Sequence, residues 1–388
     1  MVPNEWKTLR LEEIVEEDAP IRYGVVQIGE NTDGGVPIVP IKYINAIESS
    51  SLHKASKAIE GKYIKSRVRT GDVLLSVKGT IGAVGVVPPG FEGNIAREIA
   101  RIRPSREFDS SYIALQLEAE RTQKRIQNLT VGTTRREFSI HAVRNFVLEI
   151  PSLKEQQNIA NIISTWDKAI STTKSLINNS KQQKKALMQQ LFTGKKRLFD
   201  DSGKSFDDIW KEVKLGDISI ITTGSSNRED SSLHGEFTFF DRSEDIRTSS
   251  RYLFDSEAVI VPGEGQDFVP KHFKGKFDLH QRTYAIMGFS ESVGKYLFYY
   301  IGYYRYYFLS QAVGSTVKSL RLPMFQKMPI RLPTIAEQQK IAEVLTNADR
   351  EIELLEQQLA NLKQEKKALM QQLLTGKCRV KVDASEVA

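Results

Sequence analysis

The chain has 388 residues, which predicts more than one structural unit, and its 40% hydrophobic and 27% charged residues are typical of a globular protein. No apolar stretch is long enough to predict a membrane span, the N-terminus lacks the features of a signal peptide, and the single cysteine, Cys378, excludes an intrachain disulfide, so we expect a cytoplasmic protein. The formal net charge of +7 is moderate and leaves nucleic-acid binding open.

The first region, residues 1–150, has the pattern of a mixed α/β domain. Segments 68–77 and 82–88 are rich in Val, Leu and Gly and are bounded by turn residues, which predicts strands. Segment 111–126 has helical spacing.

Residues 151–197 have the signals of one long helix. Ser152 stands three residues before Glu155, a spacing that predicts a capping box at the helix start. Gly194 follows the last apolar residues, where a positive φ is easiest for glycine. The span between these signals is about 41 residues, or about 62 Å of helix.

The region over residues 198–332 is again mixed α/β. Segments 256–262 and 280–288 predict strands, and segment 294–311 predicts a helix. That helix carries seven tyrosines and two phenylalanines between Tyr296 and Phe308. These aromatic side chains could form a platform on which bases stack, but we favour the interpretation that they pack into the core of a small domain.

Residues 333–379 repeat residues 151–197 without a gap at an offset of 182, with 23 of 47 positions identical, and residues 380–388 form a tail. Thr334, Glu337 and Gly376 repeat the helix start and end signals. The segments beginning at Trp6 and Trp210 also resemble each other. The sequence therefore predicts an α+β fold with a pseudo-twofold internal repeat, in which two variable domains alternate with two long helices.

Apolar residues in both helical segments recur with spacings of four and three, which predicts a coiled-coil seam. Thr173 and Ser180 stand where the second copy has Leu355 and Leu362, so the first helix is the poorer self-associator. We therefore expect the two helices of one chain to pair as an antiparallel coiled coil, with dimerisation of the chain as the alternative. The predicted apolar seam positions are Ile159, Ile163, Trp166, Ile170, Ile177, Leu187, Leu191, Ile341, Leu345, Ile352, Leu355, Leu359, Leu362, Leu369 and Leu373.

Catalytic motifs are not evident in the sequence. There is no GxxxxGK[ST] phosphate loop, no HExxH pair and no metal-type spacing of histidines. Residues 88–91 (PPGF) are similar to the catalytic loop of adenine methyltransferases but lack its leading Asn or Asp. We expect no catalytic residue, no cofactor and no metal.

The layout resembles the specificity subunits of type I restriction–modification systems. The resemblance rests on helices that open with P-[ST]-x-x-EQQ-x-IA and close with L-[FL]-TGK-x-R, each after a variable region. Segment 71–88 and the NIAREIARIRP that follows it are also similar to parts of the family's target-recognition domains.

This resemblance implies a non-catalytic subunit in which residues 1–150 and 198–332 are target-recognition domains. Each would read one half of a split, asymmetric double-stranded DNA site, and the helices would set the spacer between the halves. It also implies two methyltransferase subunits and further restriction subunits as partners, and no membrane.

Side chains for DNA contact are expected in polar loops of both variable regions. The matched loops just before the two long helices, around 133–136 and 315–318, are the strongest candidates as groups. The candidates are Lys78, Arg97, Thr133, Thr134, Arg135, Arg136, Lys271, Lys274, Arg282, Ser315, Thr316, Lys318 and Arg321. The alternative function is a coiled-coil scaffold without sequence-specific DNA binding.

Overall fold

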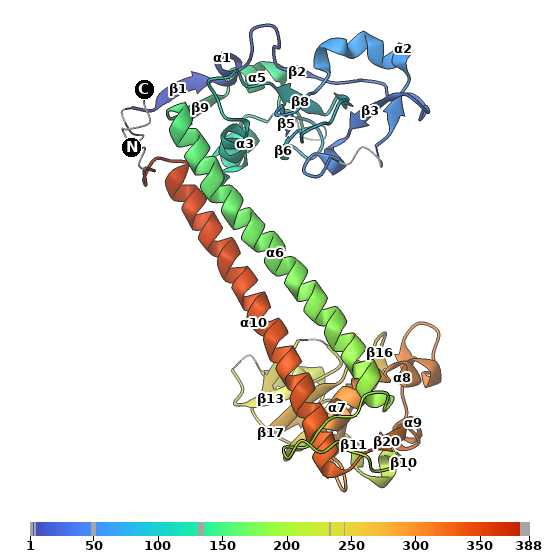
Figure 1. The fold of residues 1–388 in the computed structure, drawn as a ribbon. Coiled ribbons are helices and arrows are strands. Elements are labelled where there is room, and N and C mark those ends of the chain that lie inside the picture. The colour runs from blue at the N-terminus through green and yellow to red at the C-terminus, as the bar shows by residue number, and fades with distance from the viewer. Residues whose placement is uncertain are drawn as a thin grey trace. The chain divides into compact units, whose positions relative to one another are not determined.

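The computed structural model describes residues 3, 5–47, 52–130, 136–232, 234–243 and 245–380 of the chain (Figure 1). The chain divides into two compact units. The first unit combines the chain up to Thr173 with the chain from Gln358 onward, and the second is the stretch Lys174–Gln357. Two long helices, α6 (Leu153–Phe192) and α10 (Ile335–Leu373), contribute residues to both units.

The described part of the first unit contains three small sheets. An antiparallel sheet has the order β2 (Arg22–Tyr23), β8 (Ile99–Ile102), β5 (Val73–Ser76), β6 (Val84–Val86). A second has the order β4 (Lys54–Ala55), β3 (Val36–Val39), β7 (Asn94–Ile95), with β3 and β7 parallel. The third is the antiparallel pair β1 (Lys7–Arg10) and β9 (Val147–Ile150).

The helices of the first unit are short except for the shared pair. They are α1 (Leu11–Ile14), α2 (Lys57–Glu60), α3 (Ser110–Glu118), α4 (Glu120–Asn128) and α5 (Ile140–Arg144). Strand β5 is buried on both faces, because Val73 and Leu75 join the core under α3 whereas Leu74 joins a separate cluster with Ile99. The alternation of strand side chains thus explains why its sequence is continuously apolar.

The second unit is built around one larger sheet. Among the described residues this sheet has seven strands, in the order β11 (Ile220–Thr223), β18 (Thr283–Met287), β15 (Phe254–Pro262), β17 (Lys271–Leu279), β13 (Phe237–Phe240), β14 (Arg247–Ser249), β12 (Ser231–Ser232). Two pairs complete the strands: β10 (Lys211–Lys214) with β20 (Pro329–Leu332), and β16 (Glu264–Gly265) with β19 (Lys318–Ser319).

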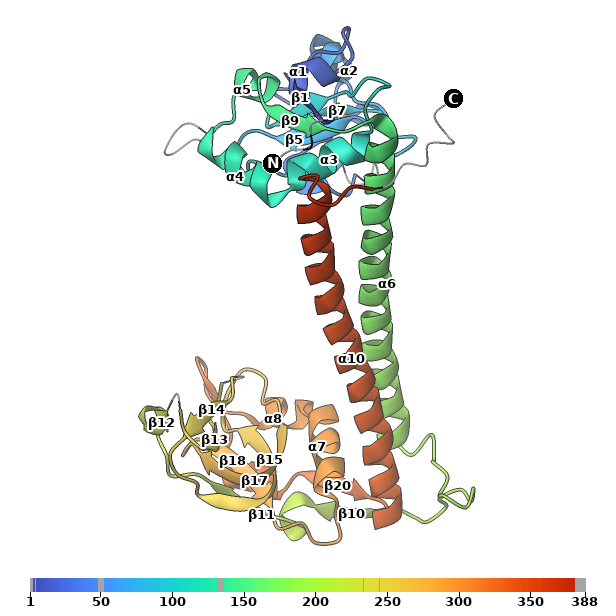
Figure 2. The ribbon, with the colours of Figure 1, turned by 90° about the vertical axis from the view of Figure 1, so that its left-hand side faces the viewer.

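Helix α7 (Gly294–Tyr303) packs on β15 and β17 and lies between the sheet and the long helices in Figure 2. Helices α8 (Tyr306–Gln311) and α9 (Leu322–Gln326) follow it. Alternate residues of β15 again face opposite clusters, with Val259 under α7 and Ile260 on the other side. The aromatic residues of α7 pack largely into this core, since Tyr296, Tyr299 and Tyr300 are buried.

Each helix predicted in a variable region is in fact two shorter helices. Segment 111–126 becomes α3 and α4 because Ala119 is extended, and the side-chain amide of Gln123 donates to the freed carbonyl of Leu117 at 2.6 Å. Segment 294–311 becomes α7 and α8, with Tyr304 at the break. The strands predicted over 68–77 and 82–88 are shorter than expected, as β5 and β6.

The two long helices begin and end close to their predicted signals. The Oγ of Ser152 and the Oγ1 of Thr334 each accept the N–H of the glutamate three residues later, at 3.4 Å. Gly194 and Gly376 have φ values of 70° and 68°, as predicted. No helix within the described residues combines the length and apolar character needed to cross a membrane.

Candidate nucleic-acid interface

Three loops of the second unit meet at one end of its large sheet. Ser226 follows β11, Asp241 follows β13, and His280 begins the turn between β17 and β18. Backbone hydrogen bonds lock them together: His280 N–H donates to the carbonyl of Phe240 at 2.9 Å, and Gln281 N–H donates to that of Ser226 at 3.0 Å. A cavity of about 450 Å³ lies there, lined by Asn227, Arg228, Glu229, Asp241, Arg242, His280, Gln281 and Arg282.

The charged groups at this sheet end are organised around Glu264. Its carboxylate forms ion pairs with Nη1 of Arg282 at 2.7 Å and Nη1 of Arg242 at 3.3 Å. Both arginine side chains remain more than half exposed. Strand β16, which carries Glu264, pairs with β19, so Lys318 lies opposite Gly265. The carboxylate therefore holds two cationic, planar hydrogen-bond donors at the edge of the cavity.

His280 and Asp241 add a neutral and an ionised group to the same cavity. Burial lowers the pKa of His280, so the ring is neutral at pH 7. Its Nδ1 accepts the N–H of Arg282 at 3.0 Å, which leaves the proton on Nε2 as a donor. Burial alone would raise the pKa of Asp241, but hydrogen bonds from Ser243 and the charges of Arg247 and Arg228 lower it.

The structure brings some predicted residues of the second unit together and separates others. Arg282 contacts Glu264, Lys318 lies opposite the neighbouring Gly265, and Lys271 Nζ donates to the carbonyl of Ser243 at 2.7 Å, beside Arg242. Ser315 and Thr316 are exposed just before β19, and Arg321 is exposed just after it. Lys274 lies mid-strand opposite Glu257, outside this grouping. Sequence reasoning missed Arg242 and Gln281.

The first unit repeats the backbone of this sheet end with different side chains. Val25 N–H donates to the carbonyl of Ile95 at 2.8 Å, Ala96 N–H to that of Val39 at 3.0 Å, and Arg97 N–H to that of Val25 at 3.0 Å. Arg97 thus stands where the second unit has Gln281. The same scaffold presents a different set of donors and acceptors in each half.

The predicted residues of the first unit gather near Arg97. The backbone N–H groups of Val77 and Lys78 donate to the carbonyl of Glu98. Lys78 Nζ contacts Glu137 at 3.1 Å and lies over the Tyr23 ring. Arg136 is exposed immediately before Glu137. The remaining candidates of this loop, Thr133, Thr134 and Arg135, lie outside the described residues.

A second basic feature of the first unit was not found from the sequence. Two cavities, of about 580 and 320 Å³, share Arg22, Ile64 and Lys65 in their linings. We call this pair of cavities the basic trough. Its other charged lining residues are Asp18, Lys62, Arg67, Arg69, Arg101, Arg103 and Arg144.

Two arginines of the basic trough have buried Nε atoms without a hydrogen-bond partner among the described residues, namely Arg101 and Arg144. Arg101 is 3% exposed and its terminal nitrogens donate only to the carbonyls of Arg67 and Pro20. Burial, and then the charge of Arg103, lower the pKa of Arg101. A buried cation bound only to carbonyls is costly, and an anion in the trough would stabilise it.

The long helices contact each other in both units. The predicted seam residues are either buried or half-buried, with Ile159, Ile163 and Leu345 fully buried and Trp166 and Leu355 half-buried. Ion pairs join the two helices in each unit, and the residue number on α10 falls as the residue number on α6 rises. Lys366 contacts Asp167 at 2.6 Å in the first unit, and Lys184 contacts Asp349 in the second.

The ends of the helices are joined by two arginine–glutamate clasps. Arg379 contacts Glu155 in the first unit, through Nε at 2.7 Å and Nη2 at 2.9 Å. Arg197 contacts Glu337 in the second unit at 2.6 and 2.8 Å. Both carboxylates are at most 2% exposed. The glutamates assigned to capping boxes therefore bind the arginine that ends the other helical segment, because a buried carboxylate needs a charged partner.

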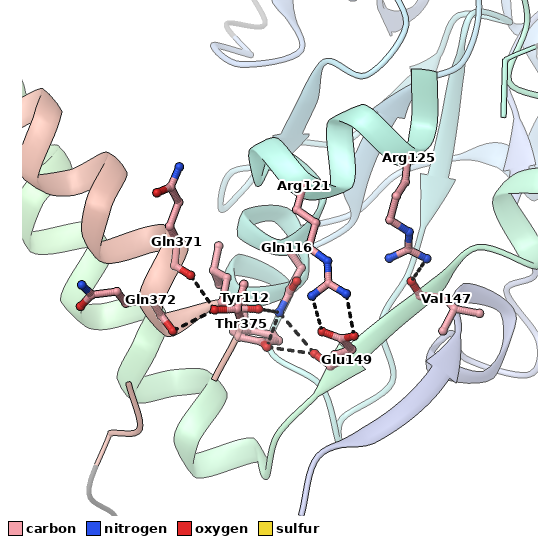
Figure 3. Close-up of polar contacts among 10 residues, drawn as sticks. Tyr112, Gln116, Arg121, Arg125, Val147, Glu149, Gln371, Gln372 and Thr375 are labelled. Atoms are coloured by element: carbon pink, nitrogen blue, oxygen red, sulfur yellow. Dashed lines mark hydrogen bonds and ion pairs between the residues drawn. The ribbon is translucent and has the colours of Figure 1, made fainter. Parts of the chain in front are cut away.

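Hydrogen bonds also attach the variable region of the first unit to the end of α10 and to β9. In the first unit the side chain of Gln116, on α3, donates to the carbonyls of Leu374 at 3.0 Å and Glu149 at 3.3 Å (Figure 3). Arg121, on α4, binds the Glu149 carboxylate through two nitrogens at 3.1 and 3.2 Å. The contact to Leu374 joins the turn between α3 and α4, which we call the α3–α4 elbow, to the end of α10, and the contacts to Glu149 join it to β9.

Among the described residues no group of three or more His, Cys, Asp or Glu side chains is arranged to hold a metal ion. The arrangement offers hydrogen-bond donors and acceptors around cavities at the sheet ends, together with cations in the basic trough. This is the chemistry needed to contact base edges and phosphates.

Comparison with known proteins gives consistent matches. The family model for the type I restriction modification DNA specificity domain matches residues 3–181 and 208–364. The MjaVIII specificity subunit of Methanocaldococcus jannaschii is 23% identical over 415 residues, covering 98% of this chain and 94% of that protein. The EcoBI specificity subunit of Escherichia coli is 26% identical over 194 residues, covering 49% of this chain and only 41% of that protein. The crystal structure of a type I system S subunit from M. genitalium superposes with a TM-score of 0.61 at 14% identity, covering 96% of this chain and 97% of that one.

Proposed function

Because the chain belongs to the family of type I restriction–modification DNA specificity domains, we propose that it is the non-catalytic subunit that selects the DNA sequence for such an enzyme. The observation that carries this proposal is the repeated sheet end. The same three loops meet in both units, yet Arg97 in one half stands where Gln281 stands in the other.

The DNA site that suits this arrangement is bipartite and asymmetric. Arginine pairs best with guanine and glutamine with adenine in the major groove, so a shared scaffold with different side chains reads different bases. In the second unit Arg242, Gln281 and Arg282 are the proposed base-reading groups, with His280 as a further donor. In the first unit Lys78, Arg97 and Arg136 take this role.

Phosphate contacts hold the protein on the duplex and carry no base information. The basic trough suits this role, because its cations converge from separate strands and loops and Arg101 is buried without a carboxylate partner. In the second unit Lys271 and Lys318 are the proposed phosphate contacts.

The long helices are proposed to pair as an antiparallel coiled coil that sets the spacer between half-sites. The crossing pairs Lys366–Asp167 and Lys184–Asp349 support this register. The helices would also seat two methyltransferase subunits, and restriction subunits would join that assembly. Such an enzyme acts on DNA in the cytoplasm.

The test is to express the chain with its methyltransferase subunit in a methylation-free host and map modified bases across the genome. We expect one split motif with two short fixed halves and a constant gap. Inserting one heptad into each long helix should change the gap and leave both halves unchanged. A soluble complex that yields no motif would refute the DNA-specificity proposal in favour of a protein-binding scaffold.

A further inference from the structure

The second unit fills the junction between α7 and the end of α6 with aromatic rings. The ring of Phe192 contacts those of Tyr296, Tyr300 and Tyr303 at centroid distances of 5.7, 5.4 and 5.6 Å. The hydroxyl of Tyr304 also donates to the Phe192 carbonyl at 3.4 Å. No side chain from outside the chain is needed to cover this junction.

Matching hydrogen bonds identify the corresponding residues of the first unit. Tyr112 and Tyr296 donate to the carbonyls of Glu149 and Arg331, which are 182 residues apart. The N–H groups of Asp109 and Val293, just before α3 and α7, likewise bind the side chains of Gln156 and Gln338. Helices α3 and α7 therefore correspond at an offset of 184, while the long helices correspond at 182.

This correspondence places smaller, non-aromatic side chains where the second unit has rings. Gln116 stands at the position of Tyr300, Ala119 at that of Tyr303, and Leu374 at that of Phe192. A cavity of about 290 Å³ results between the α3–α4 elbow and the end of α10, close to the residues of Figure 3. Leu148, Met370 and Leu374 give it an apolar floor. We call it the elbow pocket.

The charge at the rim of the elbow pocket also differs between the halves. In the second unit Lys181 contacts Glu356 at 2.6 Å. Its counterpart Lys363 lines the elbow pocket and has no acidic partner among the described residues. The residue that corresponds to Glu356 is Lys174, so the carboxylate present in one half is replaced by a cation in the other.

We propose that the elbow pocket receives an aromatic side chain, with a carboxylate beside it, from a partner protein. The ring would occupy the space that Tyr303 fills in the second unit, and the carboxylate would pair with Lys363 as Glu356 pairs with Lys181. The identity of this partner rests on the proposed function: it is one of the two methyltransferase subunits. The two copies are then held unequally, because the second unit supplies its own ring and carboxylate.

The experiment titrates the purified methyltransferase subunit onto the full chain and follows both complexes by native mass spectrometry and calorimetry. In wild type we expect two unequal affinities. Ala119→Tyr, which copies the filled half, should weaken one of them by about tenfold or more, as for a buried interface anchor. Ala119→Ser keeps the pocket open and should bind as wild type.

Lys363→Glu is an exposed change that tests the pocket even if Ala119→Tyr fails to fold. It should weaken the same affinity as Ala119→Tyr, whereas Lys363→Arg should not. If both affinities are unchanged in folded Ala119→Tyr and Lys363→Glu proteins, the proposal is overturned.

If wild type binds no methyltransferase, the proposed function fails, and the elbow pocket is then tested with p-cresol, a small-molecule analogue of the tyrosine side chain. NMR line broadening of p-cresol by wild type that Ala119→Tyr abolishes would then support the pocket, and no broadening by wild type would overturn it.

Discussion

The two arginine–glutamate clasps should differ in how much stability they contribute. Removing one partner of a buried ion pair costs about 3–5 kcal/mol because the other charge is left without compensation. Glu155 is 2% exposed but Arg379 is 39% exposed, so solvent screening reduces the expected cost of Arg379→Ala to about 2–3 kcal/mol. Arg197 is less exposed, at 24%, but Glu337 keeps a hydrogen bond from Trp210 Nε1 at 3.0 Å after its removal, so Arg197→Ala should cost less, about 1–2 kcal/mol.

Differential scanning calorimetry can measure this difference. For units of this size, about 2–3 kcal/mol corresponds to a fall of roughly 4–12 °C in the melting temperature of the first unit. Hydrogen exchange at the start of α6 should accelerate in Arg379→Ala and stay unchanged in Arg350→Ala, which removes an exposed arginine of α10. A melting temperature for Arg379→Ala within about 1 °C of wild type, or a larger effect from Arg197→Ala, would refute the reasoning.

Three further predictions concern DNA contact and pH. If the basic trough binds phosphates, Arg22→Ala and Lys65→Ala should each lower the slope of log binding constant against log salt concentration by about 0.9, equally on specific and random duplexes. Arg282→Ala should weaken binding by about 1–3 kcal/mol and relax the preference at one base of one half-site only, as read from a methylation map. Hydrogen bonds from Arg67 lower the pKa of Glu60 below its usual 4.5, so the ionised carboxylate stabilises the fold above about pH 4.5 and this stability is lost as the pH falls through the lowered pKa. Glu60→Gln should flatten that acid dependence of the melting temperature.

Local signals in the sequence were sufficient for the long helices. Their starts depend on Ser152 and Thr334 and their ends on Gly194 and Gly376, and each of these acts within one turn of the chain. The breaks in the shorter helices could not be predicted in this way. The turn at Ala119 is satisfied by Gln123, whose amide also donates to the carbonyl of Gly82, 41 residues away.

The candidate site was predictable only where its residues are close in sequence. The loop before each long helix was singled out, and Lys318 of the second loop lies opposite Gly265, the residue after Glu264. The basic trough was missed because Arg22 and Arg101 come from two strands and Lys65 and Arg144 from two short helical segments, and these residues share no spacing. The clasp role of Glu155 was missed for a similar reason, since its partner Arg379 is 224 residues away. The sequence did offer one signal for this ion pair, because each repeated segment has a glutamate near its start and an arginine at its end.

The first unit is discontinuous in sequence, so its last segment is synthesised only after the whole second unit. The first unit includes the segment from Gln358 onward, with the partners of Glu155 and Gln116, although its other residues emerge before Lys174. At about 5–20 residues per second, the intervening second unit delays that segment by roughly 10–40 s. During this interval on the ribosome the nascent first unit carries an unpaired Glu155 and an apolar helix face. Newly made chains should therefore pass through a chaperone-sensitive stage that ends when Arg379 emerges.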